Sequence, residues 1–293
     1  MKKNDYRMVK LAKGEVNVYD FGRTRLHAYR TNNPMGHFVL ILEKARRGVV
    51  VEMPCFYDNQ IELEKYISSL GITVEGILSS YHIAGGNFLG GVKRYSTLNA
   101  EAYRCGNGLG VVKGFVKIFG PSVFDGAIVD ITDYVARDLV FIAGIRFDIN
   151  RTEEAFDITI PELNAKYIHM LGHDEHSLMT SVKALEKEEK KLIGILKEGY
   201  SLILSSHHAP EDVADLKNKI RYLRRIKELA RTCESAQEFM SAVRDEYPDY
   251  GRTNFLGMTA ESLFADNPDE YRRARNASPI RRSVLSAASY AFS

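Results

Sequence analysis

The pattern of apolar and polar positions divides the chain into two successive sets of strands and helices. In the first set, short apolar or alternating runs are separated by turn signals such as Asn32-Asn33-Pro34. Residues 59–70 then carry apolar side chains at helical spacing, and Gly71 is a natural stop. The predicted strands of this set span residues 16–19, 25–29, 38–42, 49–53, 74–78 and 95–98, and a short helix follows at 99–104.

The second set begins near residue 127 and is again mixed. Its predicted strands are 127–131, 139–143, 147–150, 156–160, 166–169 and 201–204. Its predicted helices are 181–197, 211–232, 236–244 and 259–264, of which the first two are strongly amphipathic. Two such sets predict two sheets packed face to face with helices outside, which is an α/β (α+β) four-layer αββα sandwich. We expect one domain over residues 1–266 and a basic C-terminal tail over 267–293, which packs across the domain or is poorly ordered.

Composition narrows the class of protein but not its function. The chain has 293 residues, 45% of them hydrophobic, with a net charge of +2, so it can bury a large core and its overall charge favours no partner. It has no apolar run long enough for a membrane span and no secretory signal. Cys55, Cys105 and Cys233 are odd in number and far apart, so we expect buried thiols and a cytoplasmic location.

A glycine-rich turn between a predicted strand and the following segment carries the most specific signal. Residues 76–91 read GILSSYHIAGGNFLGG, in which an apolar strand opens into a Gly-Gly-Asn turn. This frame resembles the strand-to-helix turn of the metallo-β-lactamase superfamily, where His-x-His-x-Asp-His precedes Gly-Gly. Here only Tyr81 and His82 stand in the place of those four ligands.

Two later segments and one earlier strand extend the resemblance. Residues 167–173 (YIHMLGH) are similar to the family's Pro-Gly-His element, and residues 202–208 (LILSSHH) to its late strand-Gly-His element. The strand that ends in Glu52 resembles the family's early strand with an acidic end. The resemblance covers roughly residues 14–230 and implies the family's αββα fold.

Members of this family commonly hold two metal ions, most often Zn²⁺, which activate water for attack on a carbonyl or phosphoryl centre. This chain matches few of the ligands that such a site needs. His173 and His207 fit two histidine positions, and the bridging Asp of the family has no match between them. A two-metal site is therefore not expected. Three protein ligands suffice for one catalytic Zn²⁺, and His82, His173 and His207 are the predicted set, with Asp174, His176 or His208 as substitutes.

Two functions follow from this resemblance. The first is a metal-dependent hydrolase with one Zn²⁺ at His82, His173 and His207, in which Asp174 or Tyr81 orients water. The second is a non-catalytic binding or scaffold protein that binds no cofactor and uses the former pocket for recognition. The remaining histidines have a simpler interpretation: we expect His27 and His37 to be packing or surface residues, and His169 to be a hydrogen-bonded core residue.

Other motifs favour structural roles. The glycine-rich stretch 105–110 lacks the Lys-Ser/Thr pair of a phosphate-binding loop, so a turn or pocket-lining loop is expected. The basic residues at 217–225 alternate with acidic ones, which argues against a nucleic-acid surface. The sequence is compatible with a small-molecule ligand and with a homo-oligomer. No membrane partner is expected.

Overall fold

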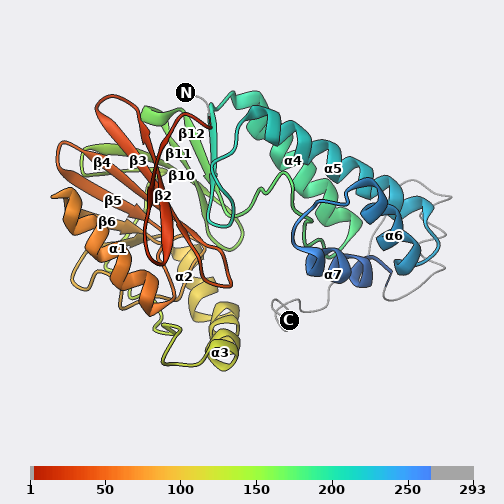
Figure 1. Ribbon diagram of the computed structural model, residues 1–293, viewed down its shortest axis with the longest axis horizontal. Coiled ribbons are helices and arrows are strands. Elements are labelled where there is room, and N and C mark those ends of the chain that lie inside the picture. Colours follow the sequence, from red (N-terminus) through yellow and green to blue (C-terminus); the bar gives the residue numbers. More distant parts are fainter. Residues whose placement is uncertain (1–2, 265–293) are drawn as a thin grey trace. The chain divides into compact units, whose positions relative to one another are not determined.

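The computed structural model describes residues 3–264, and the first part of the chain forms an eight-stranded sheet (Figure 1). Strands β1 to β5 are antiparallel neighbours, and β5 to β8 are parallel. The strands follow one another in chain order across the sheet. Their bounds are β1 (Arg7–Lys10), β2 (Gly14–Asp20), β3 (Thr24–Thr31), β4 (Phe38–Lys44), β5 (Arg47–Val51), β6 (Thr73–Leu78), β7 (Arg94–Ser96) and β8 (Asp133–Tyr134).

A second, five-stranded sheet has the order β13-β12-β11-β10-β9. Only its β12–β13 pair is parallel, because the chain leaves the sheet after β12 and returns only after helix α4. A 3₁₀ turn over Pro161–Leu163 joins β11 to β12. The strand bounds are β9 (Leu139–Ile142), β10 (Ile145–Arg151), β11 (Phe156–Ile160), β12 (Ala165–Ile168) and β13 (Leu202–Ser205).

The two sheets pack face to face around one apolar core. Leu40 and Leu42 of β4 join Phe147 of β10 and Leu204 of β13 in that core. The alternate residues of β4, such as Ile41, point to the other face of the first sheet and belong to a second apolar cluster with residues of α1 (Tyr57–Leu70). Strands covered on both faces explain the nearly continuous apolar runs of the early sequence.

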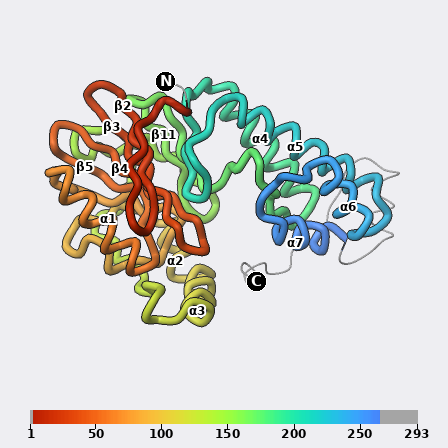
Figure 2. The backbone as a smooth tube through the Cα atoms, viewed as in Figure 1, coloured from red at the N-terminus to blue at the C-terminus, as the bar shows by residue number. Residues whose placement is uncertain are grey.

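Helices α1 to α3 connect strands of the first sheet, and the later helices form most of a second compact part of the chain. The chain can be followed in Figure 2 from the N-terminal strands through α1 to α2 (Leu98–Cys105) and α3 (Asn107–Phe119). Helix α4 (Val182–Glu198) begins at the N-cap Ser181, whose side chain accepts a hydrogen bond from the Ala184 amide. It packs beside α5 (Val213–Thr232), and α6 (Ala236–Glu246) packs with α7 (Thr253–Phe264). None of the described helices is long and apolar enough to cross a bilayer.

The chain divides into two compact units. Of the described residues, the first comprises those up to Leu171 and Tyr200–Asp212, and the second comprises Gly172–Gly199 and the residues from Val213 to Phe264. Compact units are not by themselves separately folding domains, so the single domain expected over residues 1–266 stays a prediction. The basic tail over residues 267–293 lies outside the described residues.

Three expectations for local structure are wrong. Residues 127–131 form no strand, although they are apolar enough for one. The stretch 105–110 is a turn only at Gly106 and is not the expected loop: its other residues end α2 and begin α3, in which Val112 is buried and Phe119 contacts Phe56 despite four glycines nearby. Cys105 is exposed, unlike Cys55 and Cys233.

Candidate functional site

A buried carboxylate organises the end of the first sheet. Glu52 follows β5 with a positive φ of 65° and is fully buried. Its Oε1 atom accepts hydrogen bonds from the Tyr81 amide (2.8 Å) and the Tyr167 hydroxyl (2.7 Å), and its Oε2 atom accepts one from the His82 amide (3.1 Å). Two of these three donors are backbone amides of the turn that follows β6. Glu52 therefore holds the backbone of that turn in place.

The glycine-rich turn is packed too tightly for side chains. Gly85 has a positive φ of 89°, and a Cβ on it would lie 2.7 Å from the Pro54 carbonyl oxygen. A Cβ on Gly86 would lie 2.7 Å from the Ile128 carbonyl oxygen. Glycine is thus required at both positions by backbone contacts.

Four histidines of the first unit gather at this end of the two sheets, and we refer to His37, His82, His169 and His207 as the histidine cluster. The Nε2 atom of His207 lies 3.3 Å from the Nε2 atom of His82 and 3.3 Å from that of His169. The ring of His37 lies 4.5 Å from that of His82 and 5.1 Å from that of His207, centroid to centroid. His82 follows β6, His169 follows β12 and His207 follows β13, while His37 immediately precedes β4.

Two of these spacings match those between ligands of one metal ion. Two nitrogens bound at about 2.1 Å to tetrahedral Zn²⁺ lie about 3.4 Å apart. The two Nε2 separations of 3.3 Å in the cluster agree with this value. One ligand atom from each of His37, His82 and His207 also lies within 4.8 Å of the others.

The environment of His82 keeps its ring neutral. Burial lowers the pKa of His82, although the Glu52 charge and the Met53 carbonyl oppose the effect. Only the neutral imidazole has a lone pair for a metal, so burial prepares this side chain as a ligand at neutral pH.

Tyr81 lies beside the cluster. Its ring stacks on that of His169, with centroids 4.4 Å apart and planes inclined by 3°. Its hydroxyl donates to Asp157 Oδ1 at 2.7 Å. Burial and the Asp157 charge raise the pKa of Tyr81, so it stays a hydrogen-bond donor and cannot serve as a base at neutral pH.

The structure brings together two of the three predicted ligands, His82 and His207. His173 belongs to the second unit, where its Nε2 atom lies 3.4 Å from Asp215 Oδ1. Asp174 follows it, with the carboxylate 4.0 Å from His173 Nδ1. The roles of His173 as a ligand and of Asp174 in catalysis stay predictions.

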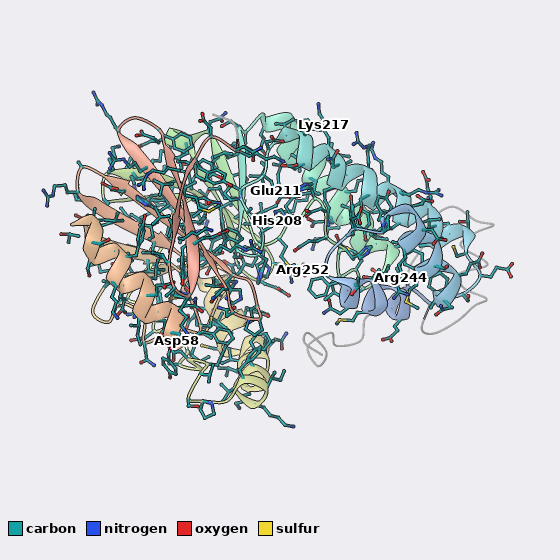
Figure 3. All side chains as sticks on the ribbon, in the orientation of Figure 1. Asp58, His208, Glu211, Lys217, Arg244 and Arg252 are labelled. Carbon is teal, nitrogen blue, oxygen red and sulfur yellow. The ribbon has the colours of Figure 1, made fainter. Side chains whose placement is uncertain are left out.

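The substitute ligands have other contacts. His208 turns to Glu211, with Nδ1 and Oε1 3.5 Å apart, and both side chains are labelled in Figure 3. His176 in the second unit contacts the Tyr222 hydroxyl through Nδ1 at 3.0 Å.

Sequence reasoning missed the positions of His37 and His169 in the cluster. His37 is packed, as one of its two expected roles requires, and is 1% exposed, but its place beside His82 is not predicted. No motif spacing contains it, because the hairpin between β3 and β4 brings it to the site. A signal existed for His169: it ends an apolar strand within the segment YIHMLGH, which carries part of the family resemblance.

No protein-family model matches the chain, and no curated protein matches its sequence. Solved structures do match. A metallo-β-lactamase family protein from Thermus thermophilus has a TM-score of 0.55 at 15% identity, covering 87% of this chain and 94% of its own. A double mutant of the sec-alkyl sulfatase PisA1 has a TM-score of 0.55 at 10% identity, covering 80% of this chain, which spans only 48% of that protein. A metallo-β-lactamase from Erythrobacter litoralis has a TM-score of 0.50 at 10% identity, covering 75% and 100%.

These likenesses establish the fold. The chain has the fold of the metallo-β-lactamase superfamily, and the predicted resemblance and αββα fold class are confirmed. The neighbours are hydrolase-like proteins, and this chain holds histidine groups with the spacing of metal ligands.

Proposed function

We propose that this protein is a hydrolase-like metalloprotein that binds a single metal ion through His82, His169 and His207. The observation that carries the proposal is that His207 Nε2 lies 3.3 Å from His82 Nε2 and 3.3 Å from His169 Nε2. His169 takes the third position here because its nitrogen lies in the first unit with the other two, whereas His173 stays an alternative third ligand.

The surrounding residues support such a role. Glu52 holds the amide of His82 and thereby the path of the turn that carries its ring. Tyr81 stacks on His169, and this contact would help to orient that imidazole. A bound Zn²⁺ would act as a Lewis acid and would lower the pKa of water towards about 7.

The test is metal binding by the full chain purified without chelators. We expect about one Zn²⁺ per chain and a higher melting temperature with Zn²⁺, because a ligand that binds only the folded state stabilises it by about 2.7 kcal/mol at 100 times its Kd. His82→Ala and His207→Ala should abolish the shift. His27→Gln is the matched control, since this buried histidine contacts Tyr66 and Glu43 instead. Absence of any Zn²⁺-dependent shift in the wild type would contradict the proposal.

A second function has support of its own. The side chain of His37 is nearly fully buried, and its ring lies beside that of His82. A fourth imidazole would therefore crowd the coordination position that a catalytic metal leaves open. This favours the non-catalytic alternative, in which the fold binds a partner or small molecule without hydrolysing it. Assays of ester and phosphodiester hydrolysis with the Zn²⁺-loaded chain distinguish the two, because only the hydrolase turns over.

A further inference from the structure

We propose that His37 is the fourth ligand of the metal and closes the site with an all-imidazole donor set. The inference rests on the proposed metal site and concerns its coordination: with His37 bound, a tetrahedral ion has no position left for water or substrate, as the non-catalytic alternative requires. His37 lies outside the four segments that carry the family resemblance, in the turn between β3 and β4.

The position of His37 is built into the backbone. The next residue, Phe38, donates its amide hydrogen to the Ser206 carbonyl at 2.8 Å, so His37 and His207 are held on adjacent backbones. The His37 carbonyl accepts from both the amide and the hydroxyl of Thr31, at 2.9 and 3.1 Å. These bonds fix the histidine independently of any metal.

The turn before His37 is also ordered by its own side chain. Asn33 Oδ1 accepts hydrogen bonds from the amides of Met35 (3.0 Å) and Gly36 (3.2 Å), and Gly36 has a positive φ of 60°. The Asn33 amide in turn donates to Asn59 of α1 at 2.9 Å. These hydrogen bonds hold the loop in one conformation and so fix the backbone position of His37.

The ring of His37 faces the proposed ligands at coordinating range. One of its nitrogens lies within 4.8 Å of the ligand atoms of His82 and His207, and the side chain is 1% exposed. The rings of the histidine cluster lie close together, with centroid separations of 4.5 Å for His37 and His82, 5.1 Å for His82 and His207, and 5.0 Å for His169 and His207.

The donor set indicates which metals fit. The group around His37, His82 and His207 contains no carboxylate, and the oxygens of Glu52 accept hydrogen bonds from backbone and tyrosine donors. Imidazole nitrogens suit Zn²⁺, Cu²⁺ and Ni²⁺, whereas Mg²⁺ and Mn²⁺ prefer oxygen ligands. We therefore expect Zn²⁺ or Co²⁺ to bind and Mg²⁺ to have no effect.

The experiment uses the full chain loaded with Co²⁺, whose visible spectrum reports coordination, and azide as an added ligand. In the wild type, azide should leave the spectrum unchanged, because His37 fills the fourth position. In His37→Ala, about one Co²⁺ per chain should remain, the affinity should fall by about 10-fold or more, and azide should now shift the spectrum. His27→Gln should behave as the wild type.

The outcomes separate the two proposals. A wild type that binds no Co²⁺ or Zn²⁺ removes the metal site itself. A wild type that binds one Co²⁺ but already responds to azide, with His37→Ala of unchanged affinity, refutes the role of His37 and leaves the metal site standing. Should His37→Ala fail to fold, X-ray absorption of the Zn²⁺-loaded wild type decides: four imidazoles support His37 as a ligand, and three refute it.

Discussion

At the scale of single residues, one carboxylate and the turn it holds decide where the candidate ligands stand. Glu52 is an anion buried in the apolar interior, which is costly unless each oxygen meets donors. Its three donors come from Tyr81, His82 and Tyr167, which all lie in or next to segments of the site. The same residue therefore stabilises the fold and orients the cluster.

Glu52→Gln should destabilise the protein by about 2–4 kcal/mol, because the amide leaves at least one of the three buried donors unsatisfied. Urea unfolding measures the loss. Glu75→Gln is the matched control: it removes an exposed ion pair with Arg47 and should cost less than about 1 kcal/mol. If the two substitutions lowered the free energy of unfolding equally, Glu52 would contribute no more to stability than an exposed ion pair.

His176 gives the second unit a dependence on pH. Burial and the charges of Lys219 and Arg244 lower the pKa of His176 to about 4, below its ordinary value of 6.5. The unfolded chain therefore takes up a proton between pH 6.5 and 4 that the folded chain does not. The contribution of His176 to the free energy of unfolding is fully present above pH 6.5. On acidification below that pH it falls by up to about 1.4 kcal/mol per pH unit.

His176→Asn removes this proton uptake, so its difference in unfolding free energy from the wild type should shrink between pH 7 and pH 5. Urea unfolding at several pH values measures that difference, in which the titration of other groups cancels. A difference that is constant with pH would contradict the assigned pKa.

At the scale of elements, the glycine-rich turn after β6 shows how closely two backbones approach. Gly86→Ala should destabilise by about 1–3 kcal/mol, because its Cβ would meet the backbone of residues 127 and 128, which cannot rotate away. Gly90→Ala in the same turn has open space and should be nearly neutral. Thermal unfolding of the two variants tests this, and a neutral Gly86→Ala would show that the turn can widen.

Hairpins and amphipathic helices could be predicted from the sequence because their periodicity is local. The strands from β2 to β6 and helices α4 and α5 lie where alternation and helical spacing placed them. Helix α3 was missed because glycines obscure its apolar stripe, and residues 127–131 are apolar for another reason: they pack beside the turn at Gly86 without pairing as a strand. Of the candidate site, motif order gave His82 and His207. His37 enters through hairpin geometry, which spacing does not encode.

At the scale of the whole molecule, the histidine cluster belongs to one of two compact units. We therefore expect metal binding to slow hydrogen exchange more in the first unit than in the second. Hydrogen exchange with and without Zn²⁺ should show slower exchange in residues 32–38, 79–84 and 202–207 of the first unit. Amides of α6 in the second unit should change little. An equal slowing in both units would instead indicate that the metal acts on the cooperative unfolding of the entire chain.

The bond from Phe38 to Ser206 joins positions 168 residues apart in the chain. The four imidazoles come from widely separated segments. A growing polypeptide therefore cannot assemble the histidine cluster until β13 has left the ribosome. A cation captured there would then act as a late cross-link over a very long loop, comparable in kind to a disulfide that closes last. Loading should accordingly follow folding of the two sheets, and chelation should loosen the ends of β4 and β13 before it disturbs the rest.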